Sequence, residues 1–138
     1  TLMENRSISQ NFTFDEFEHS SIAIALGLQN EIPNETVRKA IRLLVINILQ
    51  PLRDALGKPL VINSGYRSPE LNIAVGGSKN SQHLRGEAAD VASEDPMHLV
   101  RLIKENNLPF DQIIVYANFV HISYSSKESQ RMRIIYNR

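Results

Sequence analysis

Two histidines and an aspartate are the residues of this chain whose types and spacing best suit chemistry. His83 and Asp90 lie seven positions apart, with Gly86, Ala88 and Ala89 between them. A seven-residue step would place both side chains on one face of a helix, but a glycine disfavours a helix. We therefore expect a loop that carries His83 and a strand that carries Asp90. An imidazole and a carboxylate suit zinc, although a surface histidine and a turn aspartate can show the same spacing.

His121 lies in a segment with the alternation of a strand, over residues 119–123. Alternation places Phe119, His121 and Ser123 on one face and the apolar Val120 and Ile122 on the other. A histidine among apolar neighbours needs a partner, because burying it unpaired is costly. His121 is therefore either a hydrogen-bonded core histidine or a third metal ligand. Three protein ligands leave a fourth position open for water, as in catalytic zinc sites.

Arg67 follows an apolar segment and lies in the turn-forming sequence of residues 63–69. An arginine can bind a carboxylate or a developing oxyanion with two parallel hydrogen bonds. The alternative is an exposed arginine in a surface ion pair, which is the commoner use of this residue. The remaining histidines, His19 and His98, lie in predicted helices outside these motifs, and we expect both at the surface.

The elements that must position these residues are helices early in the chain and strands in its last third. This order predicts an α+β fold in a single domain, with a mainly antiparallel sheet packed by helices. Capping residues and apolar periodicity predict helices from about Phe14, over 22–26, from Asn34 to about Leu56, over 69–76 and from Asp95 to about Asn106. Pro51 should kink or split the long helix. Strands are predicted over 60–62, 88–92, 112–116, 119–124 and 132–136.

Length, charge and cysteine content narrow the classes of function. The 138 residues fit one domain, over residues 1–138. Fifteen basic and fifteen acidic side chains give a formal net charge of zero, which argues against nucleic acid as the main partner. The lack of cysteine excludes disulfides and thiolate metal sites. No apolar run is long enough to span a membrane, and residues 1–11 show no signal peptide, although a start at Thr1 is compatible with a removed leader.

The motifs taken together resemble a known family. Their order is Ser-Gly-Tyr-Arg-Ser at 64–68, Gly-Gly at 76–77, Ser-x-His-x-x-Gly-x-Ala-x-Asp at 81–90 and Val-His-Ile-Ser at 120–123. This order resembles the zinc D-alanyl-D-alanine carboxypeptidase family, whose relatives include phage endolysin L-alanyl-D-glutamate endopeptidases. The short phage and prophage members are most similar, because they share the opening pattern at 11–17 and the Phe-Asp-Gln segment at 110–112. The resemblance covers nearly the whole chain, and the joint pattern is specific.

The resemblance implies roles for particular residues. His83, Asp90 and His121 become zinc ligands, Arg67 stabilises the charged intermediate or orients the scissile carbonyl, and Ser81 and Tyr66 bind substrate. The implied fold is the small α+β domain shared by D-alanyl-D-alanine peptidases and hedgehog signalling domains. The implied activity is hydrolysis of a peptidoglycan stem peptide, as a carboxypeptidase or an endopeptidase. The resemblance does not give the oligomeric state, and we expect a monomer. Action on the cell wall implies export or release during phage lysis.

One position departs from the family pattern. Several branches carry an aspartate or glutamate as general base three residues before the last histidine ligand, and this chain has Asn118 there. An amide cannot take a proton from water near neutral pH. Either another acid, such as Glu87 or Asp111, serves as the base, or the chain is a slow or inactive hydrolase. The alternatives to an enzyme are a zinc-binding module that recognises cell-wall peptide and a phage structural protein.

Overall fold

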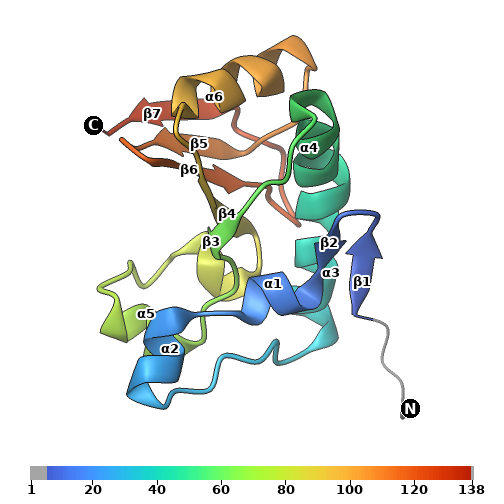
Figure 1. The fold of residues 1–138 in the computed structure, drawn as a ribbon. Coiled ribbons are helices and arrows are strands. Elements are labelled where there is room, and N and C mark those ends of the chain that lie inside the picture. Colours follow the sequence, from blue (N-terminus) through green and yellow to red (C-terminus); the bar gives the residue numbers. More distant parts are fainter. Residues whose placement is uncertain (1–5, 138) are drawn as a thin grey trace.

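A five-stranded sheet organises the part of the chain that the computed structural model describes, residues 6–137 (Figure 1). Its order is β3 (Ile62–Ser64), β4 (Ala88–Ala92), β6 (Phe119–Ser123), β5 (Gln112–Val115) and β7 (Arg133–Tyr136). All neighbours are antiparallel except β5 and β7, which run parallel. The mainly antiparallel sheet with helices confirms the predicted α+β class.

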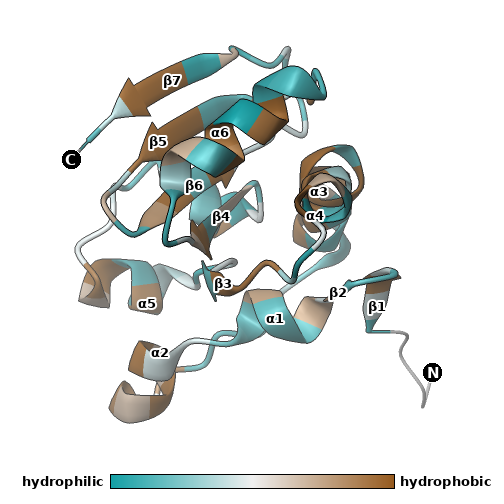
Figure 2. Ribbon diagram, turned by 45° about the horizontal axis from the view of Figure 1, so that its top comes forward, coloured by the Kyte–Doolittle hydropathy of each residue, from teal (hydrophilic) through white to brown (hydrophobic). Residues whose placement is uncertain are grey.

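Helices cover one face of the sheet and flank its β3 end. The elements before β3 are β1 (Ser7–Ser9), β2 (Phe12–Thr13), α1 (Phe14–Glu18), α2 (Ser21–Leu26), α3 (Glu35–Leu44), the π turn η1 (Val45–Leu49) and α4 (Gln50–Leu56). Later come α5 (Pro69–Ala74), the 3-10 turn η2 (Gln82–Arg85) and α6 (Pro96–Glu105). Helix α6 packs on α4, β5 and β6, and Figure 2 shows hydrophobic segments where these elements meet.

The two faces of β6 show how the core is separated from the site. Val120 and Ile122 are fully buried in the core beneath the helices. His121, between them, points to the opposite face and stays partly accessible. This alternation, which the sequence predicts, leaves one face of the sheet available for polar side chains.

Side-chain caps begin the helices where the sequence predicts them. The Glu16 carboxylate accepts the backbone N–H of Thr13 at 2.8 Å, which completes the capping box before α1. The Asn34 side chain accepts the N–H of Val37 at 3.0 Å and begins α3. Asp95 caps α6 in the same way. These starts are local events, so neighbouring residues alone determine them.

Three predicted boundaries need correction. The strand predicted over 60–62 begins later, because β3 covers Ile62–Ser64. Val61 is 59% exposed, and strand pairing begins only at Ile62. The last strand begins at Arg133, since Met132 has a φ of 56° that an extended strand does not allow. The predicted long helix runs through Pro51 by way of η1, where the N–H of Gln50 bonds to the carbonyl of Val45. A wider turn thus precedes the residue that lacks an N–H.

None of the helices within residues 6–137 has the length and hydrophobicity needed to cross a bilayer. Residues 1–5, which belong to the segment without a recognisable signal peptide, lie outside the described residues, as does residue 138.

Candidate metal centre

His83, Asp90 and His121 converge from three elements of the fold. His83 lies on η2, and the other two face each other as paired residues of β4 and β6. Asp90 Oδ1 lies 2.9 Å from His121 Nδ1 and 3.3 Å from His83 Nε2. One potential ligand atom from each residue lies within 4.8 Å of those from the other two. Two nitrogens and one carboxylate oxygen match the donor set of a catalytic zinc site, which keeps one position for water.

The position of His83 is fixed by its own turn and by the turn that carries Arg67. Its Nδ1 lies 2.7 Å from the carbonyl of Gly65, and a carbonyl can only accept, so Nδ1 carries the proton. This tautomer leaves the Nε2 lone pair directed at Asp90, which is the arrangement of metal-binding histidines. Gly86 ends the turn with a φ of 74°, and a Cβ there would lie 2.8 Å from the carbonyl of Val37. A 3-10 turn therefore replaces the loop that the sequence predicts at His83.

Asp90 is the anionic member of the group. Burial disfavours its charge, but hydrogen bonds with His121 and His83 outweigh burial and hold the pKa of its carboxyl well below the usual range. The carboxylate is therefore ionised at neutral pH and is ready to bind a cation. The residues present thus fit a zinc ion in donor type, charge and geometry.

Arg67 lies beside the three donors. Its Nη2 is 3.6 Å from Asp90 Oδ2, and its side chain is 16% exposed. Its backbone N–H donates to the carbonyl of His83 at 3.1 Å, so the two turns are joined. Its Nε and Nη1 contact the side chains of Ser64 and Asn72. Burial lowers the pKa of Arg67, and the negative charge of Asp90 opposes that effect. The guanidinium therefore faces the candidate metal centre rather than a surface ion pair.

A cavity of about 820 Å³ opens over these residues. Its lining includes Arg67, the three candidate ligands and Ser81, as well as Glu87 and Asp111. The Ser81 hydroxyl accepts the backbone N–H of His83 at 3.2 Å and begins η2. The structure thus brings the three candidate metal ligands, the candidate oxyanion-binding Arg67 and the candidate substrate-binding Ser81 to one cavity.

Two predicted site residues are not brought into this cavity. The side chain of Tyr66 is 4% exposed and packs in the core, with its backbone N–H bonded to the carbonyl of Phe17. Asn118 is exposed in the turn between β5 and β6. Neither residue is among those that line the cavity within the described chain. A base at Asn118 would therefore lie away from the candidate metal centre.

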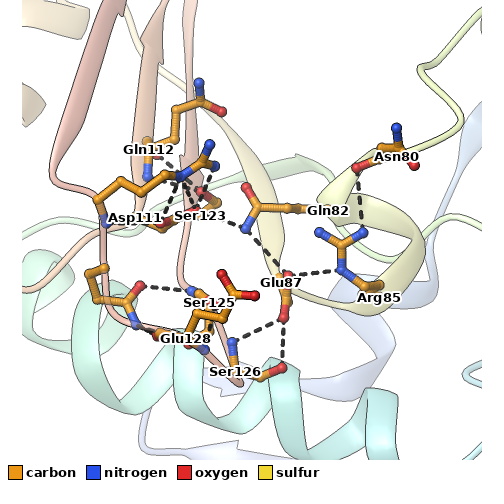
Figure 3. Close-up of polar contacts among 12 residues, drawn as sticks. Asn80, Gln82, Arg85, Glu87, Asp111, Gln112, Ser123, Ser125, Ser126 and Glu128 are labelled. Atoms are coloured by element: carbon orange, nitrogen blue, oxygen red, sulfur yellow. Dashed lines mark hydrogen bonds and ion pairs between the residues drawn. The ribbon is translucent and has the colours of Figure 1, made fainter.

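Glu87 and Asp111 line the cavity, but their carboxylates are already occupied (Figure 3). Glu87 accepts the Ser126 hydroxyl at 2.6 Å and the Ser126 N–H at 3.0 Å. Asp111 accepts hydrogen bonds from two nitrogens of Arg131, at 2.8 and 3.1 Å. The amide of Gln82 bridges the two carboxylates, at 3.3 and 3.1 Å.

These bonds set the charge of both carboxylates. Burial of Glu87 disfavours its ionisation, but hydrogen bonds from Ser126 prevail and lower its pKa. The hydrogen bonds of Arg131 lower the pKa of Asp111 and outweigh its burial. Each acid fastens residues 124–132, the segment between β6 and β7, to the sheet. Sequence reasoning missed this role because the partners are 20 to 39 residues apart.

Comparisons with known proteins agree with this geometry. The family model described as Peptidase M15 matches residues 10–123. A zinc D-Ala-D-Ala carboxypeptidase of Streptomyces albus G is 48% identical over 46 residues, which cover 33% of this chain. The match spans 18% of that relative's length. Both findings support the resemblance that the order of the motifs indicates.

Proposed function

Because the chain belongs to the peptidase M15 family, we propose that it hydrolyses a peptide bond in peptidoglycan stem peptides, with zinc held by His83, Asp90 and His121. One observation carries the proposal. Two histidines and an ionised aspartate from separate elements converge beside a partly buried arginine at the wall of a large cavity. The relative from Streptomyces albus G is named a zinc D-Ala-D-Ala carboxypeptidase, which supports a peptide substrate that ends in D-alanine.

Each residue of the site has a defined task in this reaction. When bound, zinc supplies a Lewis acid that lowers the pKa of water and polarises a carbonyl group. Asp90 contributes the negative charge, and His83 keeps the tautomer in which Nε2 is free to bind. Arg67 stabilises the oxyanion that develops on the scissile carbonyl. The water oxygen bonds to the carbonyl carbon, the C–N bond breaks, and a proton released by that water is transferred to the leaving amine.

Mass spectrometry of purified muropeptides before and after incubation with the zinc-loaded protein tests this function. Loss of one terminal alanine is expected from a carboxypeptidase, and cleavage between L-alanine and D-glutamate from an endopeptidase. The Asp90→Asn variant serves as the control, because it lacks the charged ligand. Unchanged muropeptides with the wild-type protein, at confirmed zinc occupancy, would exclude the proposed hydrolysis. Muropeptide affinity without turnover would instead indicate a binding module.

A further inference from the structure

Tyr116 lies on the same face of the sheet as the candidate ligand His121. Ile114 pairs with His121 across β5 and β6, and Tyr116 follows Ile114 by two residues, so both project to the same side. Phe119 precedes His121 by two residues and shares that face as well. All four side chains line the cavity that contains Arg67. Two aromatic rings therefore form the cavity wall next to the candidate metal centre.

The ring of Tyr116 is held in place by Phe119. The two rings are stacked, with centroids 4.2 Å apart and planes 9° from parallel. The backbone N–H of Tyr116 also donates to the carbonyl of Phe119 at 3.0 Å. A tyrosine has only two side-chain torsions, so stacking of its ring also fixes the position of its hydroxyl. No described residue forms a hydrogen bond with that hydroxyl.

Tyr116 shares the cavity with Arg67, because the side chains of both residues line it. Tyr116 and Arg67 thus approach the cavity from different elements, one from the end of β5 and the other from the turn after β3. A phenol hydroxyl can donate a hydrogen bond to an oxyanion.

From this arrangement we propose that the Tyr116 hydroxyl donates a hydrogen bond, next to Arg67, to the oxyanion that forms from the scissile carbonyl. The inference rests on the proposed peptidase function and adds a catalytic residue to it. The hydroxyl acts as a hydrogen-bond donor that stabilises negative charge in the transition state. The proposed role is that of a hydrogen-bond donor and not that of a general base.

Replacement of Tyr116 by phenylalanine tests the proposal, because the variant keeps the stacked ring and loses only the hydroxyl. We expect kcat for a D-Ala-D-Ala peptide to fall by about 10²-fold, the usual effect of losing one oxyanion donor. KM and zinc content should change little. Tyr136→Phe is the matched control, since Tyr136 is 51% exposed on β7 and lies outside the residues that line the cavity.

A second readout does not depend on turnover. A phosphinate analogue of D-Ala-D-Ala carries a tetrahedral anionic centre, so Tyr116→Phe should weaken its binding by a factor similar to the loss in kcat/KM. Affinity for the product peptide should stay the same. Unchanged affinity for the phosphinate would overturn the proposal, and so would equal weakening of phosphinate and product. If the wild type hydrolyses nothing, the proposed function fails, and the phosphinate comparison still decides the role of Tyr116.

Discussion

At the scale of single residues, the site places a negatively charged carboxylate, Asp90, beside a positively charged guanidinium, Arg67. Asp90 keeps its negative charge despite burial, because both candidate histidine ligands bond to it. Arg67 brings a positive charge to within 3.6 Å of the same carboxylate. A cation bound by the three ligands would take over the interaction with Asp90 and leave the guanidinium available to an oxyanion.

Replacing Arg67 with alanine should separate catalysis from metal binding. We expect kcat/KM to fall by about 10²-fold or more, since one strong oxyanion donor is lost. Zinc content should be nearly unchanged, because Arg67 is not among the three grouped donors. Steady-state kinetics and metal analysis of the purified variant check both expectations. Arg101→Ala, on the exposed surface of α6, is the control, and wild-type turnover by Arg67→Ala would refute the role.

At the scale of elements, the turn η2 is what places His83. It begins at the Ser81 hydroxyl and ends at Gly86, whose left-handed backbone redirects the chain into β4. Gly86 also packs against α3, at the carbonyl of Val37. The early helix α3 therefore helps to shape the candidate metal centre, although none of the three candidate ligands lies on it.

Gly86→Ala should destabilise the protein more than Gly57→Ala. Both glycines have a φ near 73°, of 74° and 73° respectively, so alanine is strained at either position by about 1–2 kcal/mol. A Cβ at Gly57 meets no atom within 4 Å, whereas one at Gly86 would lie 2.8 Å from Val37 O. Urea denaturation should thus show a loss of about 3 kcal/mol or more for Gly86→Ala. Equal losses would mean that packing against α3 has no influence.

At the scale of the whole molecule, distant parts of the chain are joined at one cavity. The candidate ligands come from η2, β4 and β6, and the acids Glu87 and Asp111 fasten residues 124–132 to the wall. An ion held by the ligands would join parts of the chain that separate when the protein unfolds. Metal binding and global stability should therefore be coupled.

Zinc should raise the Tm of the protein. Binding to the folded state alone, at a free zinc concentration 100 times Kd, adds about 2.7 kcal/mol, which corresponds to about 8–10 °C for a chain of this size. Differential scanning fluorimetry with zinc and then with a chelator measures the shift. Asp90→Asn should show little of it, because a neutral amide replaces the anionic ligand. A wild-type Tm that is insensitive to zinc would contradict the proposed ligands.

Acid should weaken the attachment of residues 124–132. The folded pKa of Asp111 is lowered, so the unfolded state binds more protons at this group, and its contribution to stability is present above pH 4. That contribution is lost as pH falls through the lower folded pKa. We expect the free energies of unfolding of the wild type and Asp111→Asn to converge below about pH 4 in metal-free buffer. Urea titrations from pH 2 to 7 test this, with exposed Glu94→Gln as control.

The sequence alone predicts most helices and strands, because their starts and their alternation depend on interactions between neighbouring residues. The caps at Thr13, Asn34 and Asp95 and the alternation around His121 depend on neighbouring residues, and they predict the elements close to where they occur. The order of the motifs also indicated the family and the residues to consider as ligands. The wider turn in the long helix lies directly before Pro51, where the sequence predicts a disturbance, but the sequence does not predict its form as a π turn.

Only the tertiary structure decided which polar residues share the cavity. Tyr66 belongs to the prominent Ser-Gly-Tyr-Arg motif yet packs in the core, whereas Tyr116, which no motif marked, lies on the face of His121. Asn118 is exposed in a turn, and Asp111 is paired with Arg131. The physical reason is that strand register and packing between distant segments set the direction of each side chain. Spacing along the chain does not contain that information.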